Sequence, residues 1–147
     1  LLVIGDPHAH PDYDNSRFTK LGKFIAKEKP QVIVCIGDMA DMPSLSSYDR
    51  GTKGFEGRRY RRDVRAVIDA QEKLFDPISK VKGYKPKLHM CLGNHEDRIT
   101  RAINASPELE GALSIDDLGY EHFGWKVTPF KKCVVTLLCG TGTLPFV

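Results

Sequence analysis

The sequence has little cysteine, one tryptophan and no long apolar run among its 147 residues. Because no apolar stretch approaches the roughly 20 residues that a membrane-spanning helix requires, we expect no membrane span and no membrane partner. The cysteines are widely spaced and form no C-x-x-C pair, which argues against a thiolate zinc site and a redox dithiol. They are Cys35, Cys91, Cys133 and Cys139. Reduced cysteines in strands, and the absence of a basic leader, favour a cytoplasmic location.

A large excess of one charge sign is also absent, since 22 Lys and Arg residues face 19 Asp and Glu, for a formal net charge of +3. The basic residues are unevenly distributed, because "RRYRRDVR", residues 58–65, contains five Arg and one Asp. The functional interpretation is a surface that contacts nucleic-acid phosphates, with Tyr60 stacking on a base. Its cations are Arg58, Arg59, Arg61 and Arg62. The alternative is a solvated helix face, which is the commoner origin of such runs.

Apolar runs that end in Gly and a polar residue predict buried strands. They are "LLVIG" at 1–5, "QVIVCIGD" at 31–38 and "KLHMCLGN" at 87–94. Apolar residues at helical spacing predict one helix from Asn15 or Ser16 to Pro30, and a longer one between Glu56 and Val81. Further helices are expected over 97–105 and 107–118, and further strands over 125–130 and 133–140.

Strands that alternate with helices predict an α/β fold, in which a layered sheet is flanked by helices in a single domain over residues 1–147. The connection at about 39–86 contains a loop rich in Gly, Ser and Pro and then the basic helix. We interpret it as an insertion, because long loops of this kind usually lie near functional sites. In such sheets, ligand-binding groups gather beyond the carboxyl ends of the strands, which locates the expected chemistry.

The ends of the three strands carry "GDPHAH", "GDMAD" and "GNHED". They supply two carboxylates, two imidazoles and an amide, from Asp6, His8, Asp38, Asn94 and His95. Such a crowd of polar groups is unfavourable unless a cation lies among them. The mixed oxygen and nitrogen ligands suit Mn, Fe or Zn better than a thiolate site or an all-oxygen calcium site would.

The three blocks resemble, in order and strand context, the signature of the calcineurin-like metallophosphoesterases, D-x-H, G-D-x-x-D and G-N-H-D/E. The resemblance implies two divalent metal ions, and hydrolysis of a phosphomonoester or phosphodiester by a hydroxide that the two metals activate. It implies that Asp6 and His8 hold one metal and that Asp38 bridges both. It further implies that Asn94 binds the second metal and that His95 lies over the leaving group.

Neighbours of these blocks are expected to support the chemistry. A His95 that is not bound to metal protonates the leaving oxygen, and Glu96 fixes its tautomer or orientation. Asp41 is expected to cap or order its loop instead of binding metal. His10 is expected in a loop near the site.

The family signature continues with three histidines that this chain lacks, one at a later strand end and two in a G-H-x-H block. The only histidine after residue 95 is His122, in a turn before a strand, and we expect it not to bind metal. We therefore expect the N-terminal part of a metallophosphoesterase, with a fold incomplete at both ends. The alternative is a non-catalytic scaffold that has lost later ligands and binds nucleic acid or a protein partner through its Arg-rich helix.

Overall fold

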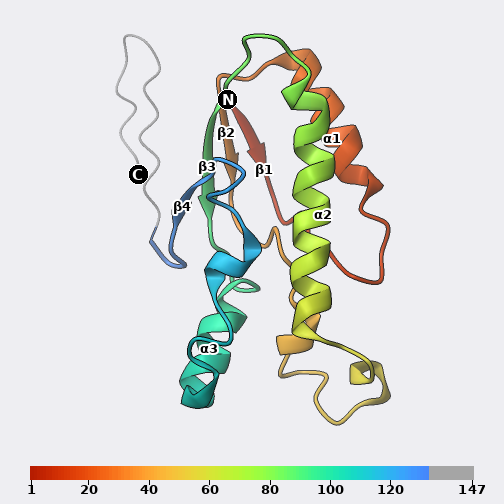
Figure 1. Cartoon of the computed structure of the whole chain (residues 1–147), viewed down its shortest axis with the longest axis vertical. Helices are drawn as coiled ribbons and strands as arrows, with labels where there is room; N and C mark the ends of the chain where they lie inside the picture. The colour runs from red at the N-terminus through yellow and green to blue at the C-terminus, as the bar shows by residue number, and fades with distance from the viewer. Residues whose placement is uncertain (133–147) are drawn as a thin grey trace.

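The structure is a computed structural model that describes residues 1–132. A sheet of four parallel strands, in the order β1-β2-β3-β4, forms its centre. The strands are β1 (Leu2–Ile4), β2 (Val32–Cys35), β3 (Lys87–Cys91) and β4 (Lys126–Thr128). All point the same way, and a connection that contains helical structure returns the chain each time (Figure 1). The predicted α/β layered sheet is confirmed, while the strand expected at 133–140 lies outside the described residues.

The three α-helices are α1 (Ser16–Glu28), α2 (Tyr60–Ser79) and α3 (Asp97–Ala105). Helices α1 and α2 lie side by side against the sheet, whereas α3 extends beyond the carboxyl ends of the strands (Figure 1). The close contact between α1 and α2 depends on Gly22, because a Cβ there would lie 2.2 Å from the carbonyl oxygen of Leu74. None of the described helices is long and apolar enough to cross a membrane.

One expected helix lies within its predicted range and another does not form. Helix α2 lies between residues 56 and 81, as predicted, and begins at residue 60 because Arg59 has an extended backbone, with φ −145° and ψ 133°. Residues 107–118 form no α-helix but two short 3₁₀ helices, η3 (Pro107–Leu109) and η4 (Ile115–Leu118). Gly111 lies between them at φ 82°, a left-handed conformation that interrupts helical hydrogen bonding.

Asn15 occupies the N-cap position of α1, as expected, but its side chain makes no capping hydrogen bond. Its amide nitrogen instead donates to the carbonyl oxygen of Ala66, at 3.4 Å, and to the carboxylate of Asp69, at 3.3 Å. Both acceptors belong to α2. This buried residue therefore ties the start of α1 to the neighbouring helix.

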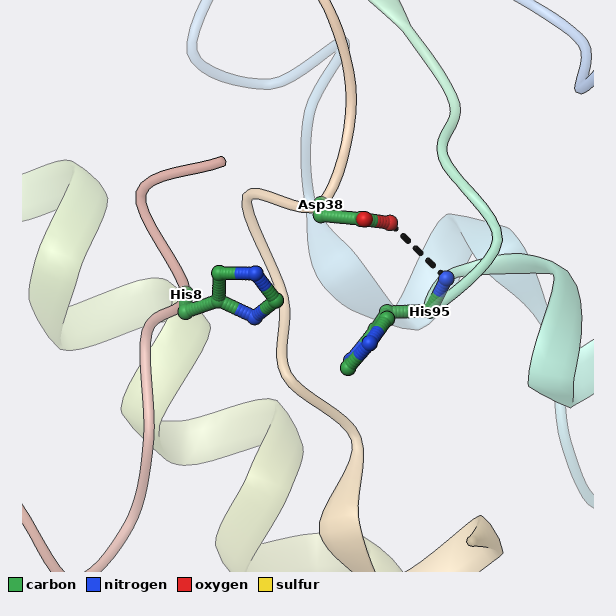
Figure 2. Close-up of side chains that lie close together, drawn as sticks. All are labelled: His8, Asp38 and His95. Carbon is green, nitrogen blue, oxygen red and sulfur yellow. Dashed lines mark hydrogen bonds between the residues drawn. The ribbon is translucent and has the colours of Figure 1, made fainter. Parts of the chain in front are cut away.

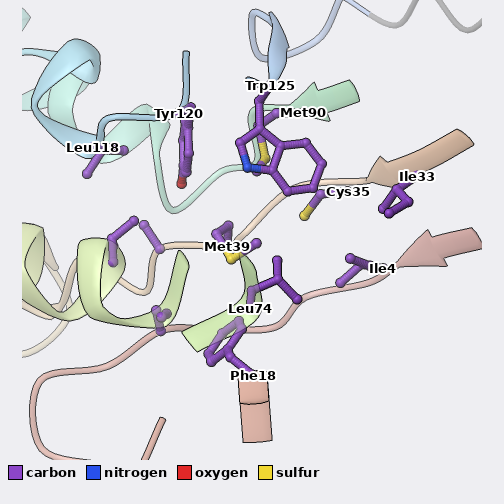
Figure 3. Packing of buried hydrophobic residues seen from close by; sticks show 14 of the residues in the cluster. Ile4, Phe18, Ile33, Cys35, Met39, Leu74, Met90, Leu118, Tyr120 and Trp125 are labelled. Atoms are coloured by element: carbon purple, nitrogen blue, oxygen red, sulfur yellow. The ribbon is translucent and has the colours of Figure 1, made fainter. Parts of the chain in front are cut away.

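The hydrophobic core lies between the sheet and the helices (Figure 3). The sheet contributes Ile4, Ile33 and Cys35, and the helices contribute Phe18 and Leu74, all of them at most 6% exposed. Burying each large apolar side chain of this kind contributes about 1.5–3 kcal/mol. Burial also raises the pKa of the Cys35 thiol to about 12, so this cysteine is a packing residue and not a reactive one.

Residues 36–59 connect β2 to α2 and contain two 3₁₀ helices, η1 (Pro43–Leu45) and η2 (Lys53–Phe55). Helix α2 holds this connection in place. The carboxylate of buried Asp63 accepts a hydrogen bond from the backbone nitrogen of Ser44, at 2.9 Å. The predicted loop and basic helix are therefore one anchored unit beside the strand ends.

Candidate metal centre

The loops after β1 and β2 run alongside each other at the carboxyl edge of the sheet. The backbone nitrogen of His8 donates to the carbonyl oxygen of Asp38, at 2.9 Å, and Ala9 forms a parallel bridge with Ala40. The backbone nitrogen of Asp41 then donates to the carbonyl oxygen of Ala9, at 3.1 Å. These bonds extend the β1–β2 pairing past the strands and fix the first two blocks relative to each other.

The loops after β2 and β3 touch because each begins with glycine. Gly37 has φ 122°, and a Cβ there would lie 2.8 Å from the Cα of Gly93. A Cβ on Gly93 would lie 2.0 Å from Oδ1 of Asp38 and 2.4 Å from its backbone nitrogen. Only glycine at both positions permits this approach, which explains why the second and third blocks both contain it.

The three loops bring His8, Asp38 and His95 together (Figure 2). One ligand atom from each lies within 4.8 Å of the others. The two imidazole rings meet edge to face, with centroids 4.6 Å apart, and Oδ1 of Asp38 accepts a hydrogen bond from the backbone nitrogen of His95, at 2.8 Å. His8 and Asp38 offer an imidazole nitrogen and a carboxylate oxygen, which are ligands that Mn, Fe and Zn accept, so this edge of the sheet fits a borderline divalent cation, with His95 beside it.

The backbone at the predicted ligands has an uncommon conformation. Asp6, His8 and Asp38 have φ values of 39°, 47° and 52°. Residues other than glycine seldom adopt this left-handed region, and each instance costs of order 1–3 kcal/mol. Such strain persists where surrounding contacts hold it, and it clusters at functional sites.

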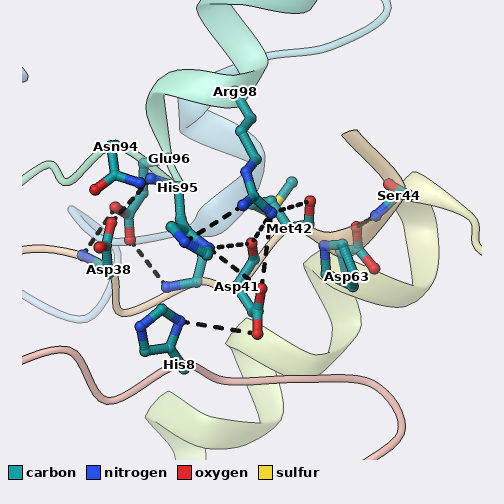
Figure 4. Close-up of polar contacts among 12 residues, drawn as sticks. His8, Asp38, Asp41, Met42, Ser44, Asp63, Asn94, His95, Glu96 and Arg98 are labelled. Atoms are coloured by element: carbon teal, nitrogen blue, oxygen red, sulfur yellow. Dashed lines mark hydrogen bonds and ion pairs between the residues drawn. The ribbon is translucent and has the colours of Figure 1, made fainter. Parts of the chain in front are cut away.

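Asp6 and Asn94 lie next to this group and not in it. Asp6 does not belong to the group of ligand atoms that lie within 4.8 Å of one another, although Asp6 is a carboxylate like Asp38. Both residues line a cavity of about 400 Å³ that Asp38 also lines, and Figure 4 shows the side chain of Asn94 beside Asp38. The structure thus gathers all four predicted metal ligands at one edge of the sheet, and His95 lies beside them.

Glu96 does not contact the imidazole of His95, so the expected orienting contact is wrong. Its fully buried carboxylate accepts hydrogen bonds from the backbone nitrogens of Asp38, Ala40 and Gly93, at 2.8–3.1 Å. It also accepts one from the hydroxyl of Tyr120, at 2.9 Å. Because one carboxylate joins backbone groups of both loops, Glu96 holds the second and third loops together.

Asp41, and not Glu96, contacts the imidazole of His95 (Figure 4). From the sequence, Asp41 was expected only to cap or order its own loop. Nδ1 of His95 lies 2.7 Å from the carbonyl oxygen of Asp41 and 3.2 Å from its Oδ1. A carbonyl oxygen only accepts, so Nδ1 carries a proton, and Nε2 is the ring nitrogen that this contact leaves unused. The sequence feature that could have indicated this role is the position of Asp41, three residues after Asp38 in the G-D-x-x-D block.

Arg98 is a second residue that the sequence did not single out. Its guanidinium donates to the carbonyl oxygens of Asp41 and Met42, at 2.9 and 3.2 Å, and Nη2 lies 3.3 Å from Nε2 of His95. It therefore fixes the loop that orients the imidazole. It comes two residues after Glu96, on the first turn of α3.

Electrostatics in this cluster couple His95 and Asp41. The hydrogen bond with the Asp41 carboxylate raises the pKa of His95 above its usual value, against an opposing effect of burial. Burial alone would raise the pKa of Asp41, but its hydrogen bond to His95 and the nearby imidazoles of His10 and His8 outweigh that effect and lower it. A protonated imidazole and an ionised carboxylate are thus mutually stabilised.

The arginine run has a different environment from the one expected. Arg58 pairs with Asp49, at 2.5 Å, and Arg62 pairs with Asp12, at 2.7 Å. Arg59 donates to the carbonyl oxygen of Arg58, and Arg61 is exposed, without a hydrogen bond or ion pair to residues 1–132.

Tyr60 is not available to stack on a base, which corrects that expectation. Its hydroxyl donates to the carboxylate of Asp117, at 2.7 Å, and its half-buried ring packs against the core. Burial raises the pKa of this hydroxyl, and the hydrogen bond to Asp117 adds to the effect. Tyr60 is therefore part of the contact between α2 and the segment around η4.

The comparisons with known proteins agree with this architecture. Residues 1–142 match the calcineurin-like phosphoesterase family, so the chain belongs to that family. No curated protein and no solved structure matches the chain. The resemblance of the three strand-end blocks to the family is confirmed, and a hydrolase with a metal centre is the class of protein that family and site define together.

Proposed function

We propose that the protein is a metal-dependent phosphoesterase that hydrolyses a phosphomonoester or a phosphodiester. The observation that carries the proposal is the convergence of His8, Asp38 and His95 within 4.8 Å, from three loops at the carboxyl edge of one sheet. Membership of the calcineurin-like phosphoesterase family supports the same reaction class.

In this proposal, two divalent cations, Mn, Fe or Zn, are held at this edge. Asp6 and His8 would hold one, Asn94 the other, and the two oxygens of Asp38 suit it to contact both. The cations would supply acidity to a water molecule and neutralise charge on the phosphate oxygens. Glu96 contributes indirectly, because it fixes the backbone that carries Asp38.

His95 is the proposed general acid for the leaving oxygen. Its Nδ1 is occupied by Asp41, at 2.7 Å from the carbonyl oxygen, so Nε2 is the atom that transfers a proton. Arg98 holds the same loop from the other side. A positioned acid of this kind typically contributes about 10²–10⁴-fold to the rate.

The proposal is tested with p-nitrophenyl phosphate and bis(p-nitrophenyl) phosphate in the presence of manganese. We expect turnover that EDTA abolishes and that Asp38→Asn lowers below detection. His95→Asn should lower kcat by about 10²–10⁴-fold, whereas the control Asp116→Asn, an exposed acid of η4, should leave it unchanged. Turnover that survives EDTA, or that Asp38→Asn leaves intact, would contradict the proposal.

The same assay separates this function from a non-catalytic scaffold that binds through the arginine run. Such a scaffold would bind manganese weakly or not at all and would turn over neither ester. Two of its four expected contact residues, Arg58 and Arg62, already pair with Asp49 and Asp12 of the same chain, and this argues for the enzyme.

A further inference from the structure

A second polar cavity lies beside the metal centre, between residues 10–15 and helix α2. Its volume is about 400 Å³. One of its lining residues is His10, two residues after His8. The cavity therefore lies next to the candidate centre, on the side of the β1 loop.

One wall of this cavity is aromatic. Tyr13 is 71% exposed, although it is a large ring, and its centroid lies 4.4 Å from that of His10. The backbone nitrogen of Asp12 donates to Nδ1 of His10, at 3.0 Å, which fixes the imidazole. An exposed ring that rests on a fixed neighbour is a suitable surface for stacking a planar group.

The opposite wall is helical and positively charged. Arg62, Arg65 and Lys73 line the cavity from α2. Arg62 pairs with Asp12 and Lys73 pairs with Asp69, both at 2.7 Å. Arg65 makes no ion pair with any carboxylate in the described part of the chain, so its guanidinium is the cation available to an incoming phosphate.

We propose that this cavity binds the nucleoside group of the phosphate ester, an inference that rests on the proposed function. The exposed face of Tyr13 accepts the base, and Arg65 contacts a phosphate. The carboxylates of Asp14 and Asp69, which also line the cavity, accept hydrogen bonds from N–H groups of the base. A sugar phosphate or an alkyl phosphate would use none of the aromatic wall. The sequence placed the stacking ring at Tyr60, whereas the structure offers Tyr13.

The test compares two diesters that share a leaving group, thymidine 5′-(p-nitrophenyl phosphate) and methyl p-nitrophenyl phosphate, with manganese. Because stacking of one base on an aromatic side chain is lost on truncation, Tyr13→Ala should lower kcat/KM for the thymidine ester by about 5- to 100-fold. For the methyl ester the change should stay below about twofold. Arg65→Ser removes a phosphate contact, and because both esters contain the phosphate it should lower kcat/KM for both.

Two variants serve as controls. Phe24→Ala removes an exposed ring of α1 that is 50% exposed and lies outside the cavity, and it should change neither ester. Tyr48→Ala removes a ring that is 86% exposed and lines a different cavity, beside Asn94. A thymidine-specific loss in Tyr48→Ala and not in Tyr13→Ala would overturn the proposal, as would equal losses on both esters in Tyr13→Ala.

Equilibrium binding separates failure of this inference from failure of the esterase itself. If the wild-type protein hydrolyses neither diester nor p-nitrophenyl phosphate, the proposed function falls, and titration calorimetry with thymidine 5′-monophosphate tests the cavity separately. Binding that Tyr13→Ala weakens by about fivefold or more supports the nucleoside site, and absent or unchanged binding overturns it. Tighter binding of oligothymidylate than of the monophosphate would identify the nucleoside as part of a strand, and equal binding would identify a free nucleotide.

Discussion

The ends of the strands and the arginine run at the start of α2 are two polar regions that the sequence marks equally clearly. At the strand ends, His8, Asp38 and His95 meet as the blocks predict. At the arginine run, Arg58 and Arg62 pair with acids of other segments, and Tyr60 is tied to Asp117. The first region presents its groups to a ligand, whereas much of the second region is engaged within the chain.

The difference lies in what fixes each region. The parallel direction of the strands and the glycines that follow them place the three strand-end blocks. Both features can be read from a few adjacent residues of the sequence. The partners of a helix face come from segments far away in sequence, such as Asp12 and Asp117. A charged run therefore gives little information about its surface until those segments are placed.

The largest effect is expected from Gly93→Ala, which forces the strand-end loops apart. The added Cβ would lie 2.0 Å from Oδ1 of Asp38. Overpacking of this kind costs about 1–3 kcal/mol or more, and we expect a lower thermal midpoint together with loss of metal binding. Gly54→Ala is the control, because its Cβ would meet nothing closer than 3.7 Å and its φ is not positive. Equal midpoints for the two variants would show that the loops do not require this contact.

A somewhat smaller effect is expected from Glu96→Gln, which keeps the shape and removes the charge. The new amide must direct its hydrogens at backbone N–H groups of Asp38 and Gly93, or at that of Ala40. Because donor then faces donor in a buried site, we expect a loss of about 2–3 kcal/mol in the free energy of unfolding, measured with urea. Glu121→Gln, at an exposed position, should lose nothing measurable. A stable Glu96→Gln would refute the role of this carboxylate as the link beneath the loops.

Within the arginine run, Arg58→Ser should destabilise the protein more than Arg61→Ser. The guanidinium of Arg58 donates to the carbonyl oxygen of Pro43, at 3.1 Å, and to Asp49, so its loss should cost about 1 kcal/mol. Arg61 has no such bond to residues 1–132 and should change stability by less than about 0.5 kcal/mol. Thermal unfolding measures both. The reverse order would mean that the run is a free surface, as the sequence alone had allowed.

The smallest effect is a pH dependence at Asp63, where α2 meets the β2 connection. Burial raises the pKa of this carboxyl, so the folded state keeps the proton to a higher pH than the unfolded chain does. Its contribution to stability is present at low pH and is lost as the pH rises through the raised pKa. Asp63→Asn should therefore gain stability relative to wild type as the pH rises above about 4, the ordinary pKa range of an Asp carboxyl, in urea titrations. Asp76→Asn changes an exposed acid of the same helix and should not gain stability over this range. Parallel plots of stability against pH for wild type and Asp63→Asn would contradict a raised pKa at Asp63.

The fold and the position of the site were predictable because short-range rules decide them. Apolar runs that end in glycine gave β1, β2 and β3, and α3 has the expected bounds, Asp97–Ala105. Helix α2 lies within its predicted range, 56–81, whereas residues 107–118 did not form one helix, since Gly111 interrupts them.

The supporting residues were not predictable in the same way. Asp41 and Glu96 are both acids beside a motif, and their roles differ because Glu96 points into the core and Asp41 toward His95. That direction depends on how two loops from different strands meet. The cavity at Tyr13 likewise depends on α2 lying beside residues 10–15, a contact between segments about 50 residues apart.

The most direct test of the account is the metal content per chain, by elemental analysis after manganese loading and desalting, for wild type, Asp38→Asn and the exposed control Asp116→Asn. We expect about two equivalents in wild type and control, because the edge of the sheet offers ligands for a dinuclear centre. Asp38→Asn should hold about one or fewer. Wild-type protein that retains no manganese, or an Asp38→Asn variant that retains as much as wild type, would contradict the claim that this edge of the sheet is a metal centre.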